Sequence, residues 1–190
     1  MYKFKQILAG AALTMLAFNV MALPSVTGTL QMTGAFFAVD ASGAHTSDGA
    51  LATGIDFDLF GTDRFRATLG DGSYAGLAGQ LGNITDFQFD PLIAPIADFW
   101  TIDIFAFELT DVTRILGDDP SKFISLEGSG IVSAVGYEDT VTSWNFSGDT
   151  TGSGIFSWSA TSTATAVPEP GVLALLALGL IGISARRRIK

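Results

Sequence analysis

Aspartates are the residues of this sequence best suited to bind a metal ion. Asp56, Asp58 and Asp63 lie within eight residues, and Asp118 and Asp119 stand together before a proline. Ca²⁺ takes six to eight oxygen ligands, which acidic loops can supply. The sequence contains no Asp-x-Asp-x-Asp-Gly loop, and Asp56 and Asp58 would equally suit the solvent face of a strand. A calcium site at these five residues is one interpretation and solvated surface is the other; no other cofactor is indicated.

Hydrolytic chemistry has weaker support. Two carboxyl groups about 5–10 Å apart could hydrolyse a glycosidic bond, but among nineteen acidic residues some pair will meet that distance by chance. His45 is the only histidine, and no Gly-x-Ser-x-Gly elbow accompanies it to suggest a Ser-His-Asp triad. The absence of cysteine excludes thiol nucleophiles and zinc–thiolate sites. We therefore expect a solvated loop histidine, no catalytic residue, and a protein that is not an enzyme.

Three tryptophans could stack on sugars if they were exposed. Trp100, Trp144 and Trp158 each alternate in phase with apolar neighbours, as side chains on the buried face of a strand do. Core packing is therefore the preferred interpretation for all three.

The elements that must position these residues are strands. Between residues 23 and 160 apolar and polar side chains alternate repeatedly, the period of a half-buried strand. After Ile104 the apolar phase shifts by one residue, to Phe105, Phe107 and Leu109, which predicts a β-bulge or a strand buried on both faces. The other alternating sets are Leu30/Met32, Ile55/Phe57, Phe87/Phe89, Thr142/Trp144/Phe146 and Phe156/Trp158/Ala160.

Turn-forming Gly, Asp and Ser residues separate these segments, and we count seven to ten strands. The predicted fold is mainly β: an antiparallel β-sandwich, of which a jelly roll is one form. We expect this exported domain to occupy residues 23–160, between an N-terminal signal helix and a C-terminal hydrophobic helix.

Charge is unevenly distributed. Residues 23–166 carry four basic and eighteen acidic side chains, a net charge of −14. A surface this acidic repels phosphate backbones, so we expect no nucleic acid partner. Without disulfides, the domain must be stabilised by a hydrophobic core or by bound ions.

The N-terminus has the pattern of a secretory signal peptide. Lys3 and Lys5 precede an apolar run over residues 7–18, and Val20 and Ala22 provide compact residues at the −3 and −1 positions of a cleavage site. We therefore expect signal peptidase to remove residues 1–22.

The C-terminus has three parts. A Ser/Thr/Ala linker over residues 161–167 leads into Pro168, Glu169 and Pro170, and residues 171–185 are almost entirely apolar. Fifteen helical residues rise about 22 Å against a bilayer core of about 30 Å, so this helix is a marginal anchor that suits transient membrane insertion. The basic cluster that should stay cytoplasmic is Arg186, Arg187, Arg188 and Lys190.

Residues 167–171, Val-Pro-Glu-Pro-Gly, followed by the Leu/Gly/Ala-rich helix and the arginine run, resemble the PEP-CTERM sorting signal. The resemblance implies recognition by an exosortase, a membrane protease of Gram-negative bacteria that make exopolysaccharide. It also implies cleavage near Pro168–Pro170 and transfer to the envelope or matrix. Similar tails occur on some ice-binding proteins and on many unrelated domains, so the tail indicates a route and not an activity.

These observations favour a non-enzymatic structural protein. It would be exported, held as an inner-membrane intermediate, cut near the Pro-Glu-Pro motif, and left at the cell surface or in the exopolysaccharide matrix of a biofilm. The alternatives are a calcium-assisted glycan-binding module of the matrix and a polysaccharide hydrolase.

Overall fold

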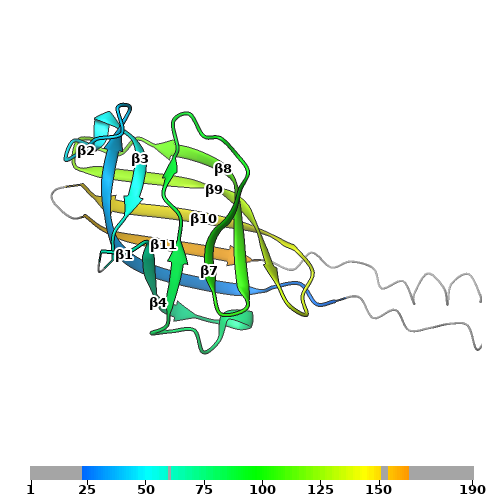
Figure 1. Ribbon diagram of the computed structural model, residues 1–190. Helices are drawn as coiled ribbons and strands as arrows, with labels where there is room; N and C mark the ends of the chain where they lie inside the picture. The colour runs from blue at the N-terminus through cyan, green and yellow to red at the C-terminus, as the bar shows by residue number, and fades with distance from the viewer. Residues whose placement is uncertain (1–22, 60, 151–153, 163–190) are drawn as a thin grey trace, which may run out of the picture. The chain divides into compact units, whose positions relative to one another are not determined.

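The computed structural model describes residues 23–59, 61–150 and 154–162 (Figure 1). The described strands belong to one compact unit, Pro24–Thr165. Within the described residues the chain forms eleven strands, two short 3₁₀ turns and no α-helix. The signal helix expected in residues 1–22 and the hydrophobic helix expected in residues 171–185 lie outside the described residues. The elements are β1 (Gly28–Asp40), β2 (His45–Thr46), η1 (Gly49–Leu51), β3 (Ala52–Phe57), β4 (Arg64–Gly70), η2 (Gly72–Tyr74), β5 (Leu81–Ile84), β6 (Phe87–Gln88), β7 (Ile96–Ile102), β8 (Phe105–Ile115), β9 (Phe123–Ala134), β10 (Thr140–Asp149) and β11 (Gly154–Ser162).

The antiparallel β architecture is confirmed, but the sheet closes into a barrel where the alternation was interpreted as a sandwich. Eight strands form a ring in the order β1, β11, β10, β9, β8, β7, β5 and β4. β1 pairs with β11 along one edge, from Gly28↔Ser162 to Phe36↔Gly154, and with β4 along the other. Alternation reports which face of a strand is buried. It does not report whether the first and last strands of a sheet meet.

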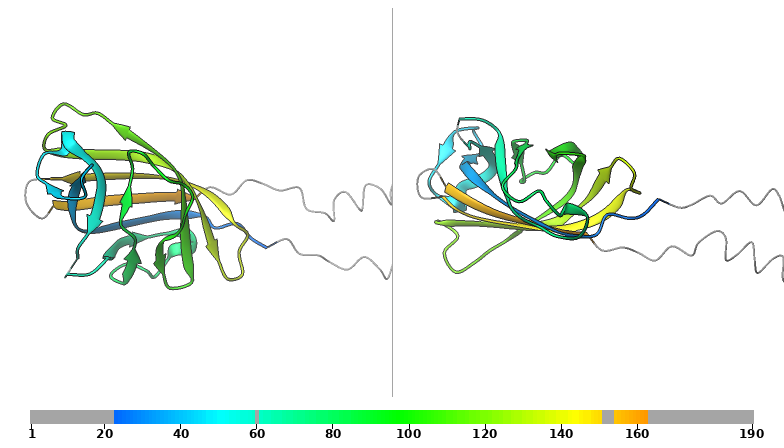
Figure 2. Two further views of the ribbon diagram at one scale, coloured as in Figure 1. Left: turned by 45° about the horizontal axis from the view of Figure 1, so that its top comes forward. Right: turned by 90° about the horizontal axis from the view of Figure 1, so that it is seen from below.

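β1 is longer than the barrel wall requires, and its second half organises the remaining strands. Over Phe36–Asp40 it pairs with β3, and β3 in turn pairs with β6. The two-residue β2 pairs with β1 at Ala38 and Val39. Figure 2 shows the long strands β8 to β11 and β1 forming one curved wall, with shorter strands on the other side.

The barrel interior is filled with aromatic and aliphatic side chains. Phe57 lies among several of them, with ring centroids 5.2 Å from Phe156 and 6.4 Å from Phe146. Trp100 stacks on Phe107 at 5.2 Å and an interplanar angle of 10°. The predicted alternation is confirmed at the described side chains, because its apolar members point inward: Leu30, Met32, Ile55, Phe57, Phe87, Phe89, Trp144, Phe146, Phe156 and Ala160 are all buried.

The phase shift near Ile104 has a different cause from the one predicted. Asp103 and Ile104 form a two-residue turn between β7 and β8, with Asp103 at φ 52°. Ile102↔Phe105 is the first pair of the hairpin. The prediction of a bulge or a doubly buried strand here was wrong, because the segment contains two strands, β7 and β8, and the apolar residues of both face the core.

Candidate functional site

Four aspartates gather at the surface where β6 joins the edge of β3. Asp56 lies in β3, Asp58 and Asp63 lie in the β3–β4 connection, and Asp86 immediately precedes β6. The pairing Ile55↔Phe87 brings the third segment beside the first. Asp86 Oδ1 accepts a hydrogen bond from the Phe57 amide at 2.8 Å. We call these four residues the acidic patch.

The pKa of Asp86 is raised at this position. Partial burial raises the pKa of Asp86 above its ordinary value, and the hydrogen bond from Phe57 N–H partly opposes this shift. The negative charges of Asp56, Asp63 and Asp58 raise that pKa further. A cation at this surface would therefore stabilise the charged form of Asp86.

His45 lies next to the acidic patch. Its Nε2 is 2.8 Å from Asp56 Oδ2, and its ring stacks on Phe37 with centroids 4.4 Å apart. The His45 side chain is 52% exposed, which agrees with a solvated histidine, although it sits in β2 and not in a loop. Within the described residues, no serine or threonine hydroxyl is hydrogen-bonded to His45. The pair therefore lacks the third member of the triad considered from the sequence.

A polar groove of about 530 Å³ borders the acidic patch at Asp63. Its floor is the β4–β5 hairpin, where Arg64 pairs with Asn83 and the Ile84 amide donates to Asp63 O at 3.0 Å. The guanidinium, amide and hydroxyl groups offer both donors and acceptors, which suits a hydroxyl-rich ligand. The lining residues are Thr62, Asp63, Arg64, Asn83, Ile84 and Thr85.

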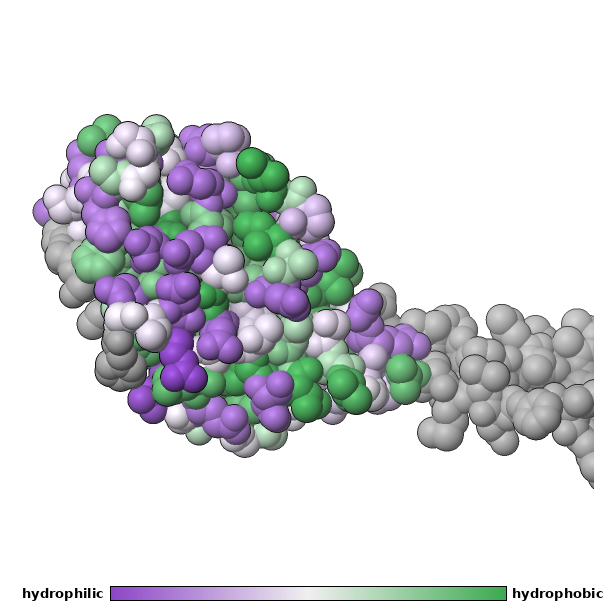
Figure 3. All heavy atoms as spheres, viewed as in Figure 1, coloured by the Kyte–Doolittle hydropathy of each residue, from purple (hydrophilic) through white to green (hydrophobic). Residues whose placement is uncertain are grey.

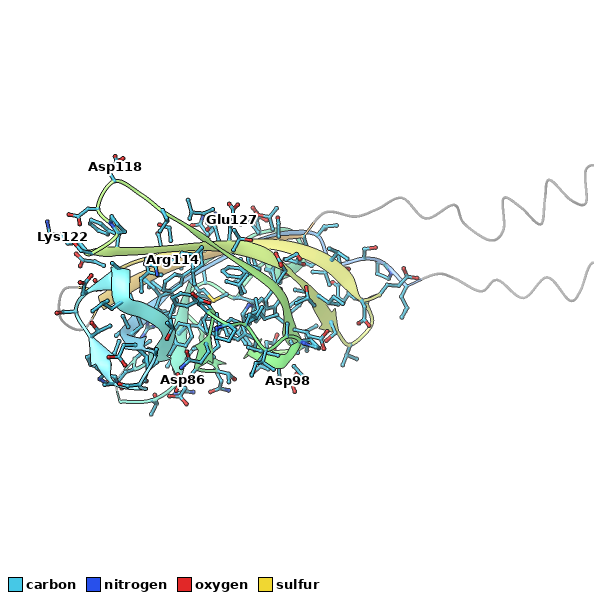
Figure 4. All side chains as sticks on the ribbon, turned by 90° about the horizontal axis from the view of Figure 1, so that it is seen from above. Asp86, Asp98, Arg114, Asp118, Lys122 and Glu127 are labelled. Carbon is cyan, nitrogen blue, oxygen red and sulfur yellow. The ribbon has the colours of Figure 1, made fainter. Side chains whose placement is uncertain are left out.

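The second pair of predicted calcium ligands lies elsewhere. Asp119 forms an ion pair with Lys122 at 2.9 Å and accepts a hydrogen bond from Ser121 Oγ at 2.6 Å. These contacts lower the pKa of Asp119, and the hydrogen bond from Ser121 has the largest effect. Figure 4 shows Asp118 and Asp86 on opposite sides of the molecule.

The five aspartates proposed as calcium ligands are therefore split between two places. Asp56, Asp58 and Asp63 come together around Asp86, whereas Asp118 and Asp119 remain apart from them. Across residues 23–59, 61–150 and 154–162, no three His, Cys, Asp or Glu side chains are arranged closely enough to hold a metal ion. Any cation at the acidic patch would need backbone or water ligands as well.

The tryptophans with described side chains are core residues, as predicted. Trp100 and Trp144 are buried, and Trp144 Nε1 donates to Ser129 O at 3.3 Å. The side chain of Trp158 lies outside the described residues.

Sequence reasoning missed Asp86, Arg64 and Asn83. Each occupies an outward position of a short strand or turn, where a charged or polar residue is ordinary. Only the pairing of β3 with β6 and of β4 with β5 would have identified them. That pairing cannot be predicted from the sequence pattern, because β6 has two residues and β5 has four.

The terminal sites lie outside the described residues. These comprise the signal cleavage residues Val20 and Ala22, the motif Pro168, Glu169 and Pro170, and the basic cluster Arg186, Arg187, Arg188 and Lys190. Within the part of the chain that the structure describes, no helix is long and apolar enough to cross a membrane.

Comparison with known proteins gives a match at one end of the chain. No curated protein and no solved structure matches it. The family model of the PEP-CTERM protein-sorting motif matches residues 166–188. This range contains Pro168–Pro170, the apolar segment and the arginines. The chain therefore carries a PEP-CTERM sorting motif at its C-terminus, which marks it as an exported protein targeted to an exosortase.

Proposed function

We propose that the protein is a structural component of the cell surface or the exopolysaccharide matrix, without catalytic activity. The signal peptide directs export, the C-terminal segment holds the chain in the inner membrane, and an exosortase cuts near Pro168–Pro170. The observation that carries this proposal is the sorting motif at residues 166–188, which follows directly on the domain that contains the barrel.

The outer surface of the barrel supports a role among hydrated polysaccharides. Three of the four exposed positions of β10, Ser143, Asn145 and Ser147, are polar, and Gln31 is exposed on β1 two strands away. These side chains are uncharged and can both donate and accept hydrogen bonds. Such a face can exchange water for sugar hydroxyls without desolvating a charge.

The test is the intact mass and location of the protein in its native host, with and without the exosortase. We expect the wild-type host to release a species that begins near Leu23 and lacks the sorting motif. The exosortase-deficient host should keep a membrane-bound form that retains residues 168–190. If the full C-terminus persists in wild-type membranes, the protein is a permanently tethered domain and the proposed release is wrong.

The acidic patch and the polar groove favour one alternative, a calcium-assisted glycan-binding module. A cation held by Asp86 and its neighbours would lie beside the donors and acceptors of Arg64 and Asn83. A ligand that binds only the folded state raises the melting temperature, so calcium should raise it relative to chelator. Asp86→Asn should abolish that rise and Asp118→Asn should preserve it. An identical melting temperature with calcium and with chelator would remove this alternative, and a glycan array would identify the sugar.

A further inference from the structure

Both ends of the described chain leave the barrel on the same side. β1 begins at Gly28 and β11 ends at Ser162, and these two residues are paired. Ahead of β1, Pro24 O accepts a hydrogen bond from the Glu138 amide at 3.0 Å. The turn between β9 and β10 therefore lies beside the chain entry. We call this side, with the β7–β8 and β9–β10 turns, the tail end of the barrel.

Exposed hydrophobic side chains gather at the tail end. Ile104, in the β7–β8 turn, is 45% exposed, and Val135, in the β9–β10 turn, is 83% exposed. The pair Phe105↔Ala134 places these two turns next to each other. Val141 is 70% exposed at the start of β10. Figure 3 shows hydrophobic residues interspersed with hydrophilic ones over the visible surface, including the right-hand part, on which β9 and β10 turn in Figure 1.

The opposite end of the barrel has a comparable set of exposed hydrophobic residues. Leu51, Leu116 and Phe123 are 62%, 74% and 51% exposed. The thirteen residues of β1 separate the two ends by about 40 Å, at about 3.3 Å per residue. Exposure alone therefore does not distinguish the ends, but the tail end is the one from which the chain continues toward the sorting motif.

The chain length limits how far the tail end can be from a membrane. Ser162 precedes Gly171 by nine residues, which span at most about 30 Å when fully extended. While residues 171–185 are inserted in a bilayer, the tail end is confined to within that distance of the lipid surface. The opposite end lies a barrel length further along the strands. Confinement of this kind raises the effective concentration of the tail end at the membrane, so that even a weak contact forms.

We propose that the tail end of the barrel rests on the lipid bilayer before cleavage, with Ile104, Val135 and Val141 in the head-group region. This inference rests on the membrane-held stage of the proposed function. Hydrophobic side chains at an interface bind in proportion to the apolar area they bury.

The charges at the tail end select the type of lipid. Asp103 and Asp139 are exposed in the same two turns, and the described cations lie in other parts of the barrel: Arg64 and Arg66 in β4, Arg114 in β8 and Lys122 before β9. The tail end therefore favours zwitterionic head groups over anionic ones. The contact should weaken as phosphatidylglycerol replaces phosphatidylcholine.

The absence of cysteine allows a direct test on the full chain. Val135→Cys and, as the matched control, Leu116→Cys are labelled with an environment-sensitive fluorophore, and the protein is reconstituted into phosphatidylcholine vesicles. Flotation with the vesicles first establishes that the chain is inserted. We expect the label at position 135 to shift to the blue and to be quenched by nitroxide lipids several-fold more than the label at position 116.

A second labelled position distinguishes a specific contact of the tail end from non-specific hydrophobic binding to the vesicles. A label at Val141→Cys should lose its blue shift when Ile104→Asp and Val135→Asp are added. It should keep that shift when Leu51→Asp and Leu116→Asp are added at the opposite end. Circular dichroism of each variant verifies that the barrel is folded.

The remaining outcomes contradict the proposal in distinguishable ways. Equal signals from positions 135 and 116 in floated protein overturn the end-on contact and leave the proposed function intact. A shift that needs added exosortase assigns the surface to the protease, and a shift without vesicles assigns it to a second copy of the chain. Failure to float overturns the membrane-held stage, and with it the proposed function.

Discussion

The phenol oxygen of Tyr74 lies 2.9 Å from Oγ of Ser162, so a residue of η2 is hydrogen-bonded to the last residue of β11. Ser162 Oγ is in turn 2.7 Å from Thr142 Oγ1, and Thr142 Oγ1 donates to Thr140 O at 3.2 Å. All four residues are buried. This chain of hydrogen bonds fastens the strand that closes the barrel.

The burial of the Tyr74 phenol predicts a loss of stability at alkaline pH. Burial raises the pKa of Tyr74 from 10.0 to about 12. The folded state thus favours the neutral phenol, while the unfolded chain ionises from about pH 10. Stability from this difference is fully present below pH 10 and declines as pH rises toward 12. By pH 11 the free energy of unfolding should fall by about 1.4 kcal/mol from this residue, since each pKa unit is worth about that amount.

Urea unfolding at a series of pH values checks this prediction. Tyr74→Phe should be less stable at neutral pH, because Ser162 loses a partner, and should show a flatter decline above pH 10. Tyr137→Phe removes a hydroxyl from a half-buried tyrosine near the β9–β10 turn and should keep the decline. Equal alkaline slopes for wild type and Tyr74→Phe would contradict the role assigned to Tyr74.

We predict that replacing Asp86, in the acidic patch, by asparagine stabilises the folded protein. Its pKa is raised in the folded state, so its contribution to stability is greatest below the unfolded pKa and is lost as pH rises through the folded value. At neutral pH the charged carboxylate therefore opposes folding. Asp86→Asn removes that charge and keeps an oxygen to accept the Phe57 amide. We expect a gain of about 0.5 kcal/mol, because water screens charges at the surface.

Thermal unfolding at neutral pH in metal-free buffer measures the effect. Asp118→Asn, on the opposite side of the molecule, should change stability little. Loss of stability in Asp86→Asn would mean that the carboxylate is needed in its charged form.

The sequence predicted those features that depend on neighbouring residues and did not predict those that depend on pairing between distant segments. The alternation around Trp144 and Phe146 identified inward residues correctly, because the period of a strand is set by its own backbone. Pro168–Pro170 were recognised because the sorting motif is contiguous. The pairing of Gly28 with Ser162 was not foreseen, since it joins opposite ends of the domain. Asp86 was missed for the same reason, because its position depends on how β6 pairs.

The two described tryptophan side chains differ in hydrogen bonding, and we predict that their replacement affects stability differently. Trp100 Nε1 is buried without a hydrogen-bond partner among the described residues, whereas Trp144 Nε1 donates to Ser129 O. Replacement by phenylalanine removes ring volume in both cases. At Trp100 it also removes an unpaired donor, whose burial costs about 1–3 kcal/mol. Trp100→Phe should therefore lower the free energy of unfolding less than Trp144→Phe, by about 1 kcal/mol in chemical denaturation. The reverse order would mean that packing of Trp100 against Phe107 outweighs its unpaired N–H.

Gly130, an inward glycine of the barrel wall, predicts a loss of stability by overpacking. A Cβ added at Gly130 of β9 would collide with the ring tip of Phe107 and with Glu108 O on the neighbouring strand. The backbone contact cannot be relieved by a rotamer change, so β8 and β9 would have to separate. Overpacking of this kind costs about 1–3 kcal/mol.

Gly117→Ala is the matched control for Gly130→Ala. No atom lies within 4 Å of a Cβ at Gly117, in the β8–β9 connection, so this substitution should be neutral or slightly stabilising through the unfolded chain. Adding Phe107→Leu to Gly130→Ala shortens one colliding side chain and should recover only part of the loss, since Glu108 O remains in place. Full recovery in the double variant would show that the ring alone requires glycine. No loss in Gly130→Ala would show that β8 and β9 can part without cost, which contradicts a tightly closed wall.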